Sequence, residues 1–195
     1  MLRQLRSAAI AVVVFTVLLG LAYPLAITGL AQLFWRHEAN GSRVYRGGRL
    51  VGSLLMGQDF AGESRYFQSR PSASGYEPTL AAASNLGPNS AQLSHEIRTR
   101  LSAFVRGEGV YDRGLTAPSV PPDAVTASGS GVDPDISVAD ARIQAHRVAA
   151  VRHLALDTVL NLIASHTYGS PGGLFGPGSV NVLALNLALD AERAP

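Results

Sequence analysis

Apolar side chains form one long uninterrupted run near the start of the chain. No residue from Ser7 to Trp35 carries a charge, and this stretch exceeds the roughly 20 residues that an α-helix needs to cross about 30 Å of hydrocarbon. Trp35 followed by Arg36 is typical of the end of such a helix, where an aromatic ring and a cation meet the interface with water. The pattern predicts a transmembrane helix over residues 8–35.

A cleaved signal peptide is the alternative interpretation of this run. A basic start precedes it and small residues follow Leu19, but the apolar core of a signal peptide spans roughly 7 to 15 residues. Here the apolar run continues to Phe34, beyond the region suited to cleavage. We therefore expect a retained anchor, with residues 1–7 before it and a soluble domain over residues 36–195.

Beyond the anchor the hydrophobic pattern breaks into short segments. The apolar run from Leu50 to Met56 predicts a strand, and residues 57–90, rich in Gly, Ser, Pro and Asn, predict a long loop. Three later segments show the spacing of amphipathic helices, and polar capping residues precede the first two. The predicted helices cover residues 91–105, capped by Asn89 or Ser90 and ended by Gly107; residues 138–152, capped by Ser137; and residues 156–166.

The remaining segments complete the predicted domain. Residues 117–134 and 169–178 carry turn-forming residues, which predict loops. The closing run SVNVLALNLALD, residues 179–190, is mostly apolar and predicts a terminal strand. A strand, several helices and a final strand favour one mixed α+β domain, and the chain shows no internal repeat. The predicted fold class is therefore α+β, with one N-terminal transmembrane helix followed by a single soluble domain.

Composition excludes several kinds of chemistry. All 16 basic residues are Arg, and the chain has neither Lys nor Cys, so it lacks the amine of a P-loop or Schiff-base enzyme and the thiol of a zinc ribbon. Arg3 and Arg6 account for the net charge of +2. Because acidic and basic residues balance beyond the anchor, we expect no nucleic-acid partner. Arginines flank the anchor on both sides, so charge alone leaves the side of the domain open.

Small residues gather in the segment VTASGSGVDPDIS, residues 125–137, just ahead of a predicted helix. A loop of this kind brings backbone N–H groups close to an anion such as a nucleotide phosphate. An ordinary tight loop is the other interpretation, because no Lys and no strand signature accompany the segment. The candidate nucleotide contacts in it are Ser128, Gly129, Ser130 and Gly131.

Acidic residues and histidines near this loop suggest metal binding only weakly. Asp133, Asp135 and Asp140 are calcium ligands by type, but they lack the spacing and the final Glu of an EF-hand. Helix capping by these acids is favoured instead. His146 and His153 do not form the His-Glu-x-x-His pattern of zinc hydrolases, so we expect no metal site.

Aromatic and arginine side chains also gather in the predicted loop before residue 90. Tyr66, Phe67, Arg70 and Tyr76 are of the types enriched at protein interfaces. Packing within the loop explains the same residues equally well. The sequence leaves both interpretations open.

Six segments together resemble one known family, the C subunit of the Kdp potassium-transporting ATPase. Each is weak alone, but their order and spacing across nearly the whole chain make the combination specific. They are GSLLMGQDF (residues 52–60), YFQSRPSA (66–73), SNLGPNS (84–90), VTASGSGVDP (125–134), RVAAVR (147–152) and VNVLALNLALD (180–190).

The resemblance implies an accessory, non-catalytic subunit of an ATP-driven potassium uptake complex. Its partners would be a potassium-channel-like subunit and a P-type ATPase subunit, besides the lipid bilayer. Family members are described as catalytic chaperones that raise the ATP affinity of the pump subunit, with a Gln implicated that corresponds to Gln144. The chain would then have no catalytic residue, metal or cofactor of its own, and would share ATP with the pump subunit. One uncharged helix cannot enclose an ion pore, which agrees with this role.

The resemblance also implies a topology in the inner (plasma) membrane. The N-terminus would be cytoplasmic and the α+β domain extracytoplasmic, where ATP is scarce, so the topology and the nucleotide role are in tension. We favour a domain that covers the ion entrance of the channel-like subunit. Small residues on the anchor would permit close helix packing there: Gly20, Ala22, Ala26 and Gly29.

A different class of function remains as the alternative. The chain would be a membrane-anchored extracytoplasmic small-ligand-binding protein or hydrolase, using Ser128, Asp133 and His153. A triad of Ser128 or Ser130 with His153 and Asp157 lacks a nucleophile elbow, which makes it the weaker hypothesis. Purification together with an ATPase would favour the accessory subunit, whereas a solitary active domain would favour this alternative.

Overall fold

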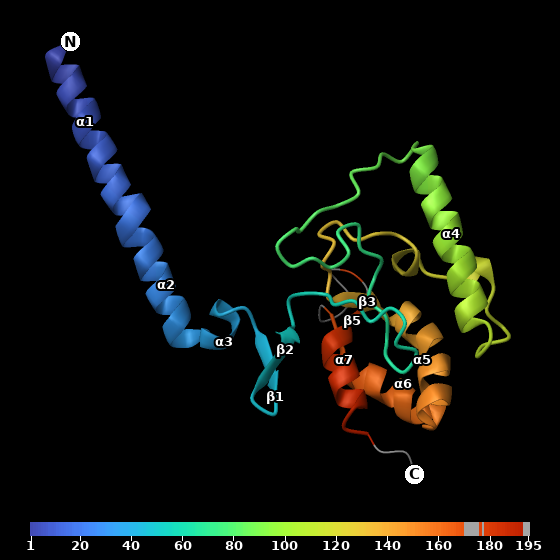
Figure 1. Ribbon diagram of the computed structural model, residues 1–195. Helices are drawn as coiled ribbons and strands as arrows, with labels where there is room; N and C mark the ends of the chain where they lie inside the picture. Colours follow the sequence, from blue (N-terminus) through green and yellow to red (C-terminus); the bar gives the residue numbers. More distant parts are fainter. Residues whose placement is uncertain (170–175, 177, 193–195) are drawn as a thin grey trace. The chain divides into compact units, whose positions relative to one another are not determined.

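The computed structural model describes residues 1–169, 176 and 178–192. The chain divides into two compact units, Met1–Arg43 and Val44–Pro195, and each is considered on its own. The first contains a long apolar helix, and the second contains helices and small sheets (Figure 1). The α+β class with one N-terminal apolar helix is thereby confirmed.

One continuous helix makes up most of the first unit. α1 (Leu2–Val17), a single π-helical turn (Leu18–Ala22) and α2 (Tyr23–Phe34) follow one another without a break. The whole helix has 33 residues and is long and apolar enough to cross a membrane. The short helix α3 (Arg36–Ala39) follows it.

The π-helical turn is explained by the proline that follows it. Pro24 has no N–H to donate to the carbonyl of Gly20, and its ring would clash with that carbonyl in a regular α-helix. The wider turn moves this carbonyl aside, and the Tyr23 N–H bonds to the carbonyl of Leu18, five residues back. A local π turn thus accommodates Pro24 within a continuous helix.

A two-stranded hairpin opens the part of the chain after the long apolar helix. β1 (Arg43–Arg46) and β2 (Arg49–Ser53) pair around Gly47 and Gly48. The φ angles of the two glycines, +56° and +78°, are those of a type I′ turn, which needs left-handed residues at both central positions. The predicted strand over residues 50–56 is confirmed in its first half.

The three predicted helices of the domain are present as α4 (Ala91–Glu108), α5 (Val138–Arg152) and α6 (Leu156–Ser165). The predicted caps Ser90 and Ser137 are also confirmed. Each hydroxyl accepts a backbone N–H three residues ahead, at 3.3 and 3.0 Å. These bonds satisfy donors that the first turn of a helix leaves unpaired.

The prediction that Gly107 ends the first of these helices is wrong. α4 continues through Gly107 to Glu108, and Gly109 is its C-cap, with its N–H on the Val105 carbonyl at 3.0 Å. A glycine inside a helix costs only about 1 kcal/mol. The second glycine, two residues later, therefore marks the end.

A small antiparallel sheet joins distant parts of the domain. Its strands are β3 (Asp135–Ser137), β4 (Thr167–Tyr168) and β5 (Ser179–Asn181), in the order β3, β5, β4. Ile136 pairs with Val180, and both side chains are buried. The sequence analysis missed β3 because three residues are too few for a recognisable alternation.

The predicted terminal strand is wrong for most of its length. Only its first three residues form β5, and the chain then enters the helix α7 (Val182–Leu189). Asn181 caps this helix through its Oδ1, which accepts the Ala184 N–H at 3.0 Å. A short apolar run is compatible with a buried strand or a buried helix, and periodicity does not separate them. Most of the predicted linker 169–178 lies outside the described residues.

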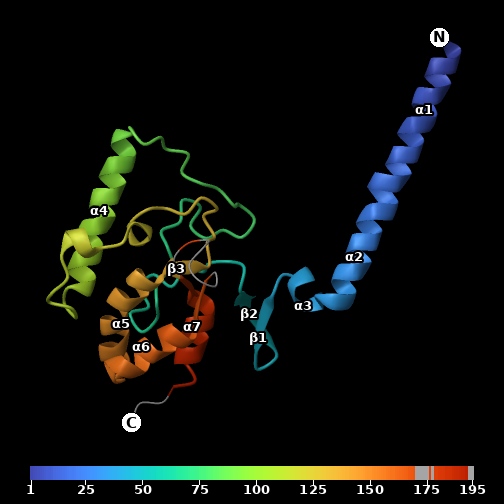
Figure 2. The ribbon, with the colours of Figure 1, turned by 180° about the vertical axis from the view of Figure 1, so that it is seen from behind.

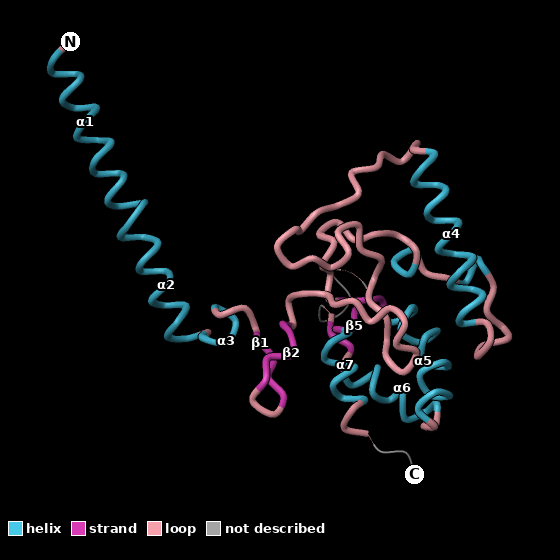
Figure 3. Tube along the Cα trace, in the orientation of Figure 1, coloured by secondary structure: helices cyan, strands magenta, loops and turns pink. Residues whose placement is uncertain are grey.

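Long loops connect these elements (Figure 3). Residues 57–90 form no helix or strand, as predicted. Residues 117–134 form only two single 3-10 turns, Ala117–Ser119 and Pro122–Ala124.

The hydrophobic core lies among α5, α6, α7 and the three-stranded sheet (Figures 1 and 2). Helix α7 is apolar apart from Asn186, as expected for a helix largely buried among these elements. One core residue, Phe67, comes from the long loop and is fully buried. The core consists of Phe67, Ile136, Ala141, Ala145, Val148, Ala149, Val159, Ile163, Val180, Val182, Leu185 and Leu189.

Candidate functional site

The Ser-Gly loop proposed as an anion site packs against the long loop. Ser128 is buried; its N–H donates to the Pro71 carbonyl and its Oγ accepts the Gly131 N–H, both at 3.0 Å. Ser72 Oγ donates to the Gly131 carbonyl at 2.6 Å. Gly131 has a φ of +72°, and a Cβ there would collide with Ser74. Only glycine fits this close approach.

The two other residues of the Ser-Gly loop lie at its surface. Gly129 and Ser130 are exposed, and Ser130 Oγ accepts the Val132 N–H at 3.2 Å. The Val132 carbonyl accepts the Gly57 N–H at 2.7 Å. The polar groups of this loop are thus largely used to join it to other loops.

Gln144, on α5, is almost fully buried and saturated with hydrogen bonds. Its Oε1 accepts the Gln68 N–H at 2.7 Å and an Arg147 N–H at 3.0 Å. Its Nε2 donates to the Gln68 carbonyl at 3.2 Å and to Asp140 Oδ1 at 3.0 Å. A side-chain amide has two acceptor positions and two N–H groups, so all four are occupied.

Asn186, on α7, binds the preceding residue of the loop in the same way. Its Oδ1 accepts the Phe67 N–H at 2.8 Å, and its Nδ2 donates to the Phe67 carbonyl at 3.0 Å. Asn186 was not among the residues predicted from the sequence. A lone amide inside an apolar helix is a usable signal, because a buried polar group needs a partner.

Two arginines of α5 bind the carbonyls just before these residues. Arg147 donates to the carbonyls of Ser64 and Tyr66, and Arg152 donates to that of Arg65 at 2.7 Å. Residues 64–68, here called the bound segment, therefore have a backbone group of every residue held by a side chain of α5 or α7. These side chains bond to the backbone groups of the segment, as a neighbouring strand would in a sheet.

Asp190 collects three further contacts near the bound segment. It forms ion pairs with Arg46 at 2.6 Å and Arg152 at 2.8 Å, and it accepts the Tyr66 hydroxyl at 3.0 Å. Burial alone would raise the pKa of Asp190, but hydrogen bonds from Arg152, Arg46 and Tyr66 lower it overall. The carboxylate therefore stays charged and ties the hairpin to the C-terminal end of α7.

Two buried carboxyl groups, those of Asp140 and Glu108, bond to Gln144 and Arg147 respectively. Burial raises the pKa of Asp140 to about 7, although the hydrogen bond from Gln144 lowers it in part. Burial also raises the pKa of Glu108, against the attraction of Arg147, which bonds to its Oε1 at 2.8 Å. Glu108 Oε2 is buried without a hydrogen-bond partner among the described residues. Asp140 is thus a buried network residue rather than a simple helix cap.

The remaining acidic candidates hold loops together. Asp133 pairs with Arg70 at 2.9 Å and accepts the Asp135 N–H at 3.1 Å. Tyr76 donates its hydroxyl to the Arg70 carbonyl, and Asp135 accepts the Tyr168 hydroxyl. Across the described residues, no group of three or more His, Asp and Glu side chains is placed to hold a metal ion.

The residues of the hydrolase hypothesis are not joined to one another. Ser128 is buried and bonded to Gly131, whereas His153 and Asp157 are exposed. His153 follows α5 in a left-handed conformation, with a φ of +57°. Within the described part of the chain no hydrogen bond connects this histidine to either serine, and His146 is half-buried on α5.

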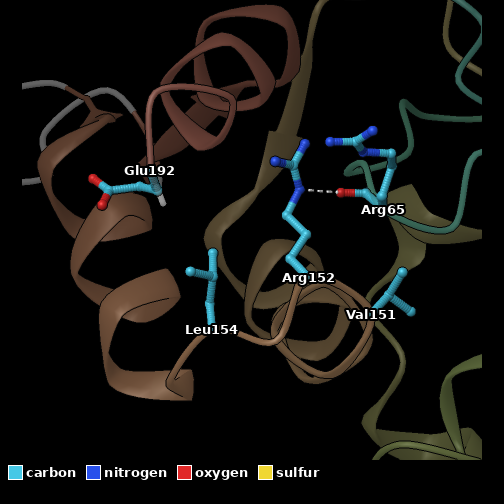
Figure 4. Close-up of a pocket in the computed structure, with 5 residues that line it drawn as sticks. All are labelled: Arg65, Val151, Arg152, Leu154 and Glu192. Atoms are coloured by element: carbon cyan, nitrogen blue, oxygen red, sulfur yellow. Dashed lines mark hydrogen bonds between the residues drawn. The ribbon is translucent and has the colours of Figure 1, made fainter. Parts of the chain in front are cut away.

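A pocket of about 390 Å³ lies beside the bound segment and is shown in Figure 4. Arg65, Val151, Arg152, Leu154 and Glu192 line it. The Arg65 and Arg152 guanidinium groups stand 5.4 and 4.9 Å from the centre of the Tyr66 ring. All three nitrogens of Arg152 already bond within the domain, so this arginine supports the fold rather than a ligand.

Comparison with known proteins identifies the family. The family model described as KdpC, K+-transporting ATPase, c chain, matches residues 5–191. The chain belongs to the KdpC family. The KdpC subunit of the Rhodospirillum rubrum potassium-transporting ATPase is 48% identical over 198 residues, covering 100% of this chain and 98% of that protein. The KdpC subunit of Mycobacterium tuberculosis H37Rv is 44% identical over 192 residues (97% and 99% covered), and that of Cereibacter sphaeroides is 45% identical over 194 residues (100% of both).

Membership of the KdpC family confirms the resemblance and makes the chain a subunit of a potassium-transporting ATPase. Four of the six segments that carry the resemblance meet in the domain. YFQSRPSA contains most of the bound segment, RVAAVR contains both arginines that hold it, and VNVLALNLALD contains Asn186 and Asp190. VTASGSGVDP is the Ser-Gly loop, which packs against YFQSRPSA.

The pKa of Asp140 predicts a fall in stability with rising pH. The ordinary value is 3.8, so between about pH 4 and pH 7 the folded protein keeps a proton that the unfolded chain has lost. The free energy of unfolding should therefore decrease over this range. Asp140→Asn has the shape of the protonated acid and should remove the part of the decrease that Asp140 causes, leaving the variant more stable than wild type at pH 8 and similar at pH 4.

Denaturant unfolding of the purified full chain across pH measures this effect. The exposed substitution Asp157→Asn is the matched control and should follow the wild type. Parallel curves for wild type and Asp140→Asn would show that Asp140 is not a protonated buried group.

Proposed function

We propose that the chain is the non-catalytic accessory subunit of an ATP-driven potassium uptake complex. Its partners are the potassium-channel-like subunit and the P-type ATPase subunit. The observation that carries this proposal is the match to the KdpC family over residues 5–191, together with a helix able to cross a membrane. The buried polar side chains described above bond to one another and to backbone, which suits a binding domain of fixed shape.

The anchor is the proposed contact with the channel-like subunit. Ala22, Ala26 and Gly29 follow a spacing of four and three residues, which places them on one face of a helix. No atom lies within 4 Å of a Cβ added at Gly29, so a neighbouring helix can come close there. Small residues at such positions favour helix packing in membranes. Gly20 belongs to the π-helical turn, which ends at Ala22.

Adding bulk to this face should release the subunit. The double substitution Ala26→Leu and Gly29→Leu is expected to prevent copurification with the other ATPase subunits after mild solubilisation, because the helices could no longer approach closely. Thr28→Leu, which adds bulk on another face of the same helix, is the control. Retention of the double variant at the wild-type level would count against this contact.

The proposed topology has a retained anchor, residues 1–7 in the cytoplasm and residues 36–195 outside it, in the inner membrane. The family resemblance supports this arrangement. With this topology the domain covers the ion entrance of the channel-like subunit. Because the chain has no cysteine, a single introduced cysteine reports its own position.

A membrane-impermeant maleimide tests the topology in intact cells. Ser102→Cys, at an exposed position on α4, should be labelled without lysis. Gln4→Cys, before the anchor, should be labelled only after lysis. The reverse pattern would place the domain in the cytoplasm, and a mature protein lacking Gln4 would show that the anchor is cleaved.

An effect on the ATP affinity of the pump subunit is part of the proposed role. Direct nucleotide contact at Gln144 would require breaking hydrogen bonds to Gln68, Asp140 and Arg147. We therefore favour an indirect effect, in which Gln144 fixes the shape of the domain. The surface that contacts the pump then depends on the bound segment being in place.

Separate replacement of the Gln144 and Asn186 side chains distinguishes direct nucleotide contact from an indirect effect through the shape of the domain. Gln144→Leu leaves buried groups unpaired, at about 1–3 kcal/mol for each group, and should lower the unfolding midpoint of the full chain without nucleotide. Asn186→Leu removes the equivalent bonds to Phe67 and should act alike on stability and on the ATP KM of the complex. A changed KM for Gln144→Leu alone, with unchanged stability, would indicate direct nucleotide contact.

A further inference from the structure

The hairpin that follows the anchor has an unusual surface. Seven large apolar side chains of the second unit are exposed among the described residues, and three of them, Tyr45, Leu50 and Leu55, fall within eleven residues. Tyr45 and Leu50 are 59% and 57% exposed. A soluble domain gains nothing from exposing an aromatic and an aliphatic side chain this close together, so contact with another surface is expected.

The two faces of the hairpin differ. In a hairpin with a two-residue turn, residues at equal distance from the turn lie opposite each other, so Tyr45 faces Leu50. Side chains alternate along each strand, which puts Val44, Arg46 and Arg49 on the other face. Val44 is half-buried and Arg46 pairs with Asp190 at 2.6 Å. One face therefore packs on the domain, and the face with Tyr45 and Leu50 is open.

The excess of arginine around the hairpin indicates that the open face contacts an anionic surface. From Arg36 to Gln58 the chain has four arginines and a single acid, Glu38, whereas acidic and basic residues balance over the whole region beyond the anchor. Arg43 and Arg49 are exposed at the two ends of the hairpin strands. A cationic rim around exposed Tyr and Leu side chains complements an anionic lipid surface, where the rings and aliphatic groups enter the interface and the guanidinium groups meet phosphate.

The covalent chain keeps the hairpin near the bilayer. Tyr45 is eleven residues beyond Phe34, the last residue of α2, and each residue spans at most about 3.6 Å. The hairpin cannot leave the neighbourhood of the membrane that the helix is proposed to cross. We propose that Tyr45 and Leu50 on the open face enter the lipid interface, while Arg43 on the same face and the exposed Arg49 at the edge beside the turn bind the headgroups of anionic phospholipids. This inference rests on the retained anchor but on neither the topology nor the transport partners.

A tryptophan in the hairpin tests the contact in the full chain. The natural chain has one tryptophan, Trp35, so Tyr45→Trp in a Trp35→Phe background gives a single reporter. The protein is reconstituted into vesicles of phosphatidylcholine alone or of equal parts of phosphatidylcholine and phosphatidylglycerol. Blue-shifted emission and quenching by brominated lipid are expected in the anionic vesicles, and both should weaken at high salt.

Neutralising the rim should release the hairpin. An arginine near an anionic surface is worth about fivefold in binding, so Arg43→Gln with Arg49→Gln should shift the equilibrium towards the free hairpin by about 25-fold. Arg106→Gln with Arg113→Gln removes the same charge from exposed positions in and after α4 and should have no effect. Emission that is alike in both kinds of vesicle would overturn the proposal. A blue shift that requires the other ATPase subunits would also overturn it and identify a protein interface.

Discussion

The fold of the soluble domain depends on how a stretch without regular secondary structure is buried. Phe67 enters the core from a loop, and burial takes the backbone around it away from water. Leaving these buried N–H and C=O groups unpaired would destabilise the fold by more free energy than burial of the phenyl ring contributes. Amide side chains of α5 and α7 supply both missing bonds at Phe67 and at Gln68, and two arginines bind the carbonyls before them. The loop is therefore held as firmly as a strand, although it pairs with none.

This arrangement explains why residues that are candidate ligand contacts in the sequence are hydrogen-bonded within the domain in the structure. Gln144 has no hydrogen-bonding position left, and Ser128 is bonded within its loop. Asp190, which the sequence did not single out, is shared by two arginines and a tyrosine. Such a network is costly to complete and costly to disturb, because a partly satisfied buried network is worse than an apolar core. A domain built in this way presents a fixed surface to partners. That property suits an accessory subunit of a potassium-transporting ATPase, the role indicated by its family.

Much of the architecture could be predicted from sequence, and the failures have physical causes. The long apolar N-terminal helix, the three helices α4 to α6 and the caps Ser90 and Ser137 follow from hydrophobic spacing and polar caps, which are local signals. Helix α7 could not be told from a strand, because a largely buried helix lacks the polar face that reveals a helical period. The partners of Gln144 could not be predicted either, since residue 68 is 76 positions away and lies in a loop with no periodicity. Asn186 was a detectable sign, as a polar amide among the apolar residues of α7.

Hydrogen exchange at Phe67 and Gln68 in the full chain tests the central claim most directly. Amides in an ordinary surface loop exchange rapidly, whereas amides bonded to buried side chains exchange only when the structure around them opens. The account predicts that these two N–H groups are protected as strongly as those in the middle of α5, with or without ATP. Rapid exchange at both, in a domain whose α5 remains protected, would show that the bound segment is not held by Gln144 and Asn186.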